Sequence, residues 1–146
     1  MSGFEAATVG DRTVTQGRTL TEADVVNFAG VSGDFNHLHT DAEAMADSDY
    51  GERIVHGALL FAVMTGLLWQ SRDEAARESV VAFYGVDRLR FTAPAYLGET
   101  VHVELEVAEK TPRDHPEATG VVRYDAELIT DSGRTVLAAQ LLSLLR

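Results

Sequence analysis

The second half of the chain alternates between apolar and polar residues, with the two-residue period of β-strands that bury one face. In the clearest segment, single polar residues separate four apolar ones: Val101, Val103, Leu105 and Val107. Turn signals rich in glycine and proline divide this half into separate segments. The pattern predicts four antiparallel strands, joined by hairpin-length connections, over residues 80–91, 100–109, 119–129 and 135–145.

The beginning of the chain predicts a strand, a helix and a loop. Residues 11–20 mix valine with several threonines, which indicates a weak strand. Thr21 then precedes two acidic residues and a run of apolar residues at helical spacing, which is typical of a helix start with a threonine N-cap. This helix is expected to end near Gly30. Residues 31–40 are rich in Gly, Ser, Asp and Asn, and we expect a loop there.

The longest predicted helix covers residues 56–69. It follows a short helix over residues 41–46 and a polar loop over residues 47–53. Because it is apolar on nearly every side, we expect other structure to surround it, with Met64 and Trp69 in the core. The apolar stretch is shorter than the ~20 residues that span a bilayer, so a buried helix is the better interpretation.

This order of elements predicts an α+β fold in a single domain over residues 1–146. We expect an antiparallel sheet wrapped around one long buried central helix. Such a sheet leaves edge strands with unpaired backbone groups, and a second copy of the chain can cover them. The sequence therefore predicts a homodimer.

Composition and charge narrow the possible partners. The 146 residues include 23 Asp and Glu against 12 Lys and Arg, a formal net charge of -11, which argues against nucleic-acid and anionic-membrane partners. Lys110 is the only lysine, a bias that a salt-rich cell or an arginine-rich genome could each produce. Cysteine is absent, which removes disulfides, thiolate nucleophiles and zinc–thiolate sites. The first ten residues lack the pattern of a secretory signal, so we expect a cytoplasmic protein.

A polar cluster at residues 32–41 carries the side chains best suited to chemistry. Asp34 and His39 stand five positions apart in a predicted turn, so both can face one water molecule and act as a general acid–base pair. The same residue types also suit an ordinary surface turn, and the spacing leaves that alternative open. His37, His39 and Asp41 could instead ligate a metal, but the further ligands of a metal hydrolase are missing nearby, so no metal is predicted.

The cluster also carries a family resemblance. Residues 32–41 read Ser-Gly-Asp-Phe-Asn-His-Leu-His-Thr-Asp, which resembles the pattern Ser-Gly-Asp-x-Asn-Pro-x-His of MaoC-like hydratases. Ile-Val-His-Gly at residues 54–57 resembles the His-Gly that opens the central helix of that family, and residues 90–100 are similar to its next strand and turn. The resemblance covers most of the chain. It implies a hotdog fold that adds water to a trans-2-enoyl-CoA, giving the (R)-3-hydroxyacyl-CoA, without a metal or a cofactor.

The same resemblance assigns roles to individual residues. It places the catalytic pair of the family on Asp34 and His39, with Asn36 as a supporting residue between them. The backbone N–H of Gly57, at the start of the central helix, would receive the negative charge that develops on the thioester oxygen. Thr65 is expected to share a face of that helix with Gly57 and to bond the pair.

One departure from the family pattern is His37, which replaces a proline and adds a second imidazole beside His39. Motif position favours His39 as the catalytic histidine. His56 is interpreted as structural, because a histidine just before a helix often bonds nearby backbone groups. The aromatic candidates for an acyl tunnel, or equally for the core, are Tyr84, Phe91 and Tyr96.

An acyl-CoA substrate brings several phosphates to an acidic protein, so binding needs local positive groups or screening by salt. Arg53, Arg88 and Arg90 lie near the recognised motifs and are the candidates. Two other functions suit the same fold: an acyl-CoA thioesterase, which would release a free thiol, and a module that binds acyl-CoA without turnover. The presence of both Asp34 and His39 argues against the binding module.

Overall fold

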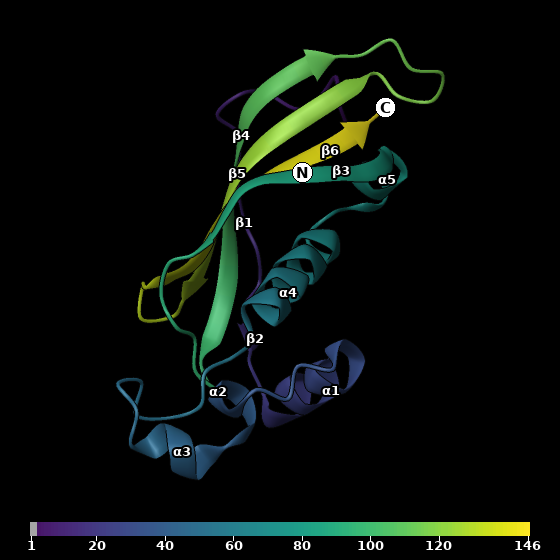
Figure 1. Ribbon diagram of the computed structural model, residues 1–146. Helices are drawn as coiled ribbons and strands as arrows, with labels where there is room; N and C mark the ends of the chain where they lie inside the picture. Colours follow the sequence, from purple (N-terminus) through teal and green to yellow (C-terminus); the bar gives the residue numbers. More distant parts are fainter. Residues whose placement is uncertain (1–2) are drawn as a thin grey trace.

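The alternating segments form one antiparallel sheet that curves around the longest helix (Figure 1). The computed structural model describes residues 3–146, so the first two residues of the predicted domain lie outside the described part. The strands follow the order β1-β4-β5-β6-β3 across the sheet, and β2 also pairs with β4. Their bounds are β1 (Arg12–Val14), β2 (Arg18–Thr19), β3 (Val80–Phe91), β4 (Thr100–Pro112), β5 (Gly120–Thr130) and β6 (Thr135–Leu145).

The four long strands lie where the alternation predicts them, and the expected first strand is divided into β1 and β2. Val101, Val103 and Leu105 of β4 are buried against the helix side, as the two-residue period requires. The strands β3 and β4 are consecutive in the chain but are not neighbours in the sheet. β3 pairs with β6 at one edge of the sheet, whereas β4 pairs with β5, so the chain crosses the sheet between them.

The central helix α4 (Gly57–Gln70) lies against the curved sheet, and its side chains Leu60, Met64 and Leu67 are buried there (Figure 1). The expected α+β arrangement is thereby confirmed. The core position predicted for Trp69 is wrong, because this side chain is 50% exposed. The sheet covers only one side of α4 within a single chain, so the apolar residues on its other side stay accessible.

Helix α1 (Glu22–Ser32) begins at the predicted N-cap, where the side chain of Thr21 takes part in a capping box. It ends at Gly33, whose φ of 78° gives the left-handed C-cap that favours glycine. The helix therefore continues two residues beyond Gly30, near which its end was predicted. Gly30 keeps helical backbone, and the helix stops before the next glycine, Gly33.

Three short helices complete the structure: α2 (His37–Thr40), α3 (Ala42–Ala46) and α5 (Glu74–Glu78). Asp41 caps α3 as predicted, whereas α2 replaces part of the predicted loop and α5 has no counterpart among the predicted elements. α1, α2 and α3 gather near the N-terminal end of α4 (Figure 1). Among residues 3–146, no helix is both long and apolar enough to cross a membrane.

Candidate active site

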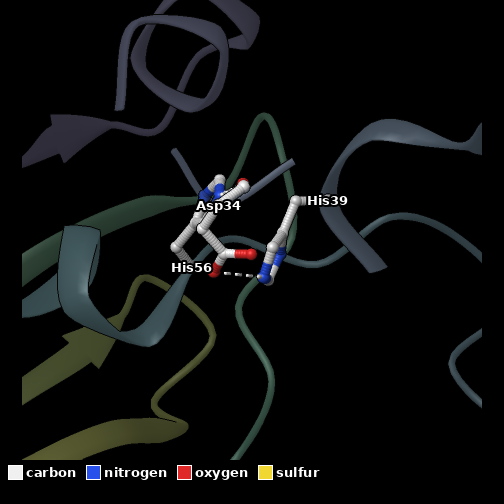
Figure 2. Close-up of side chains that lie close together, drawn as sticks. All are labelled: Asp34, His39 and His56. Carbon is white, nitrogen blue, oxygen red and sulfur yellow. Dashed lines mark hydrogen bonds and ion pairs between the residues drawn. The ribbon is translucent and has the colours of Figure 1, made fainter. Parts of the chain in front are cut away.

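Asp34 lies in the loop between α1 and α2, and hydrogen bonds fix its backbone and one carboxylate oxygen. Its N–H donates to the hydroxyl oxygen of Ser32 at 3.1 Å, and its Oδ1 accepts from the N–H of Asn36 at 3.3 Å. Asn36 also caps α2, because its Oδ1 accepts from the N–H of Leu38 at 3.0 Å. The other carboxylate oxygen of Asp34, Oδ2, faces His39 (Figure 2).

The ring of His39 in α2 is buried, and a backbone carbonyl sets its orientation. Nδ1 lies 2.7 Å from the carbonyl oxygen of Ile54, which can only accept, so Nδ1 carries the proton. Nε2 of the neutral ring therefore presents a lone pair, 3.9 Å from Oδ2 of Asp34. This separation is too long for a direct hydrogen bond, but one water molecule can contact both atoms.

His56, the N-cap residue of α4, supports both members of the pair. Its ring is 2% exposed and stacks on the ring of His39, with the centroids 3.7 Å apart. Its Nε2 lies 2.9 Å from the carbonyl oxygen of Asp34, and Phe28 of α1 packs edge-on against the ring. These contacts agree with the structural interpretation of His56.

The N-terminus of α4, which begins at Gly57, is uncapped. The other four helices in residues 3–146 each have an N-cap side chain that accepts from a first-turn N–H group: Thr21, Asn36, Asp41 and Asp73. No side chain does this for α4, so its first-turn N–H groups can donate to a ligand. A cavity of about 390 Å³ opens at this point, lined by His39, Gly57 and Phe91 among others.

Of the two predicted supporting residues, Asn36 lies beside the catalytic pair and Thr65 does not. Asn36 stands beside Asp34 and binds α2, as described above. The hydroxyl of Thr65 donates to the carbonyl oxygen of Ala62 at 2.8 Å, within α4, so the structure does not bring Thr65 to the pair. It lines a different cavity, near Trp69. A threonine inside a helix often bonds a carbonyl of the preceding turn, which explains this outcome.

The alternative metal ligands do not assemble. His37 lies on the exposed surface of α2, away from the cavity that His39 lines. In the described part of the chain, ligand-type atoms of three side chains lie within 4.8 Å of one another only at Asp34, His39 and His56. One ring nitrogen of each histidine there already bonds a backbone carbonyl.

The three candidate arginines do not line the cavity. Arg53 is paired with Glu22, with Nη1 donating to Oε1 at 2.9 Å, and it also reaches the carbonyl oxygen of His39. The hydrogen bond from Arg53 lowers the pKa of Glu22 and raises the pKa of Arg53. Arg88 and Arg90 lie on the exposed surface of β3, and Arg88 lines a groove over the sheet instead.

Sequence reasoning missed two contributors to the site. The carbonyl of Ile54 fixes the tautomer of His39, and the side chain of Tyr50 lines the cavity. A backbone carbonyl carries no sequence signal, since every residue has one. Of the aromatic candidates, Phe91 lines the cavity, whereas Tyr84 is exposed on β3.

The assembled site combines two chemical capacities. The carboxylate of Asp34 and Nε2 of His39 both accept hydrogen bonds, so a water between them would donate both of its protons and turn a lone pair outward. The uncapped N–H groups at Gly57 can stabilise a negative charge that develops on a carbonyl oxygen in the same cavity. Together they suit the addition of water to a double bond conjugated with a carbonyl.

Comparisons with known proteins all indicate the same family. The model of the MaoC-like domain family matches residues 4–128. The (R)-specific enoyl-CoA hydratase of Aeromonas caviae is 36% identical over 101 residues, which are 69% of this chain and 71% of the relative. Protein MaoC of Klebsiella aerogenes is 44% identical over 108 residues, which are 74% of this chain but 31% of that protein. The chain thus spans only about a third of the length of Klebsiella MaoC.

Solved structures share the fold across nearly the whole chain. The monoamine oxidase regulatory protein of Archaeoglobus fulgidus has a TM-score of 0.89 and 35% identity, with 99% of this chain and 94% of that chain covered. The (R)-hydratase of A. caviae has a TM-score of 0.78 and 27% identity, with 97% and 99% covered. A Mycobacterium tuberculosis protein described as a double hotdog fold matches with a TM-score of 0.82 at 20% identity. The predicted hotdog fold is confirmed.

Proposed function

The chain belongs to the MaoC-like domain family, whose relatives include hydratases and dehydratases, and from this premise we propose that it interconverts trans-2-enoyl-CoA and (R)-3-hydroxyacyl-CoA. One observation carries the proposal. The only uncapped helix N-terminus in residues 3–146 opens into the cavity that His39 lines, and Asp34 stands 3.9 Å from that histidine. Two relatives support this proposal by their names: the Aeromonas (R)-specific enoyl-CoA hydratase and a 3-hydroxybutyryl-CoA dehydratase of Methylorubrum extorquens.

The reaction follows from the positions of these groups. A water held by Asp34 and His39 attacks C3 of the enoyl thioester, and His39 Nε2 takes one of its protons. The C2–C3 π electrons move towards the thioester oxygen, where the N–H of Gly57 stabilises the charge. Transfer of the proton to C2 then completes the addition of one water, as hydroxyl on C3 and hydrogen on C2. No step in this sequence requires a metal or a cofactor.

We also propose that two copies of the chain pair through β3. This strand forms one edge of the sheet, and it exposes the aromatic side chains Phe83 and Tyr84. A long edge strand with exposed apolar groups favours pairing with another strand. The opposite edge is formed by the short strands β1 and β2, which both pair with β4, and it offers far less surface.

The test of the proposed activity uses crotonyl-CoA. We expect purified protein to remove the enoyl absorbance, to release no free thiol, and to give a product of the (R) configuration on chiral analysis. A thiol reagent in a parallel reaction separates this outcome from thioesterase activity. Folded protein that hydrates no enoyl-CoA of any chain length tried, or that releases thiol instead, would contradict the proposal.

A further inference from the structure

His56 occupies the N-cap position of α4, but its side chain does not cap the helix. An N-cap side chain normally accepts a hydrogen bond from an N–H group of the first turn. In the other four helices of residues 3–146, the N-cap side chain makes this bond. At α4 the first-turn N–H groups have no side-chain partner within residues 3–146, although a side chain that can accept stands next to them.

The unused acceptor is Nδ1 of His56. Nε2 of the same ring lies 2.9 Å from the carbonyl oxygen of Asp34, which can only accept, so Nε2 carries the proton and Nδ1 of the neutral ring has a lone pair. Nδ1 is buried and has no hydrogen-bond partner among the described residues. A buried acceptor without a partner lowers the stability of a protein, so this arrangement calls for an explanation.

An imidazole ring is able to accept such a bond. Nδ1 of His115 accepts from the N–H of Glu117 at 3.1 Å, two residues along the chain. The ring of His56 is held instead against Asp34 and His39 (Figure 2). It donates to the backbone of Asp34 and stacks on His39, with the ring centroids 3.7 Å apart. Contacts with the two candidate catalytic residues thus take the place of the cap.

We propose that His56 is a positioning residue that keeps the N-terminus of α4 open for the substrate. Because Asp34 and His39 hold its ring, the side chain does not cap α4, and the N–H of Gly57 stays free for the thioester carbonyl oxygen. A capping oxygen would compete for the same end of the helix and would lie close to the oxygen that gains negative charge. The unpaired Nδ1 is the cost in stability of this open helix end. The role rests on the proposed hydratase function, because it concerns the carbonyl oxygen of that substrate.

Two substitutions that differ by one methylene group separate this role from a purely structural one. His56→Asn introduces one of the strongest N-cap residues, whereas the glutamine of His56→Gln is not a preferred N-cap and its amide N–H can replace Nε2–H as the donor to Asp34. In the hydration of crotonyl-CoA, we expect His56→Asn to lower kcat at least about 100-fold. KM should change much less, because the bond to the oxygen strengthens in the transition state. His56→Gln should stay within about tenfold of wild type, because it loses only the ring stack.

His115→Asn is the matched control. It makes the same chemical change in the loop after β4, outside the cavity that His39 lines, and asparagine can still accept from the N–H of Glu117. Its kcat should equal that of the wild type. His56→Ser introduces a second strong N-cap residue and should repeat the loss of His56→Asn. Circular dichroism of each variant establishes that it is folded.

A measurement without turnover tests the open helix end directly. Butyryl-CoA labelled with ¹³C at the thioester carbonyl has no double bond and cannot be hydrated. In infrared difference spectra, its C=O stretch should move to lower wavenumber when it binds to the wild type or to His56→Gln, but not when it binds to His56→Asn. A wild type that fails to hydrate crotonyl-CoA would overturn the proposed function, whereas this spectrum tests the role of His56 separately.

The proposal is overturned if folded His56→Asn keeps kcat within about tenfold of wild type, or if His56→Gln loses as much as His56→Asn. It is also overturned if the carbonyl stretch is the same in the wild type and both variants. If neither His56→Asn nor His56→Ser folds, the ¹⁵N chemical shifts of His56 in the wild type decide. A proton on Nε2 together with the shifted carbonyl stretch supports the proposal, and a proton on Nδ1 overturns it.

Discussion

At the scale of single residues, Asp34 and His39 are held in the same way: a backbone group bonds one polar atom of each side chain, and the other polar atom faces the partner side chain. The N–H of Asn36 holds Oδ1 of Asp34, and the carbonyl of Ile54 holds Nδ1 of His39. Because these bonds fix the ring and the carboxylate, the two remaining atoms can hold a water without first losing side-chain freedom. The pair is thus prepared before any substrate arrives.

Gly57 is the residue where a single methyl group should matter. A Cβ at this position would lie 2.8 Å from the ring of Phe91, so Gly57→Ala must displace that ring, which lines the cavity. We expect kcat/KM for crotonyl-CoA to fall about tenfold or more, with the fold retained. Phe91→Ala in the same chain should recover part of the loss, because it removes the overlap.

Gly66→Ala is the control for Gly57→Ala. It adds the same methyl group to α4, but a Cβ at Gly66 meets nothing within 4 Å. Its kcat/KM should stay close to that of the wild type. Equal losses in both variants would show that the effect comes from α4 as a whole and not from contact with Phe91.

At the scale of elements, the end of α1 sets the position of Asp34. Gly33 stops the helix with φ of 78°, and nothing lies within 4 Å of a Cβ built there. Gly33→Ala should therefore lower the free energy of unfolding by about 1–2 kcal/mol through backbone strain alone, and should also slow turnover by shifting Asp34. Chemical denaturation and the hydration assay measure the two effects.

Gly30→Ala, on the same helix, should have the opposite sign. Gly30 has helical backbone and open space around it, so alanine should stabilise α1 by about 1 kcal/mol. A destabilised Gly30→Ala, or an unchanged Gly33→Ala, would contradict this description of where α1 ends.

The ion pair between Glu22 and Arg53 joins α1 to the loop before α4, and it predicts a pH dependence. Its hydrogen bond lowers the pKa of Glu22 from the ordinary value of 4.5, so the stabilisation is complete above that value and is lost as the pH falls through the lowered pKa. Glu22→Gln should thus destabilise the protein at neutral pH, by at most about 1 kcal/mol because the pair is solvent-exposed. In denaturation curves the difference from wild type should shrink below about pH 4.

Glu43→Gln provides the comparison for Glu22→Gln. Glu43 also stands in the first turn of a helix, α3, so it shares any favourable interaction with the helix dipole. It takes part in none of the ion pairs within residues 3–146. If both variants lose the same stability with the same pH dependence, the ion pair with Arg53 is not the cause.

Local sequence patterns predicted most of the helices and strands. They failed where tertiary contacts determine the position or exposure of a residue. The period of β4 and the N-cap at Thr21 are local signals, and the structure confirms both. The exposure of Trp69 depends on how much of α4 the sheet covers, which the apolar pattern of the helix does not contain. Likewise, the motif located Asp34 and His39, but only the fold reveals that the carbonyl oxygen of Ile54 orients the ring of His39.

At the scale of the whole molecule, the sheet has one long edge strand, β3, and a short one, β1, on the opposite side. A charged side chain should therefore affect dimer formation at β3 but not at β1. Tyr84 on β3 is 60% exposed, and Tyr84→Asp should convert the proposed dimer to a monomer in light scattering after size-exclusion chromatography. Val14→Asp, on the opposite edge strand β1, should leave the mass unchanged. A wild type that is monomeric at all concentrations, or a Tyr84→Asp variant that stays dimeric, would contradict pairing through β3.

The proposed active site requires that His39, and not His37, holds the water. His39→Gln and His37→Gln make the same chemical change two residues apart in α2, but only His39 lines the cavity beside Asp34. In steady-state hydration of crotonyl-CoA, we predict that His39→Gln lowers kcat by at least about 100-fold and that His37→Gln stays within about twofold of wild type. Near-normal turnover by folded His39→Gln, or a larger loss in His37→Gln, would contradict the proposed active site.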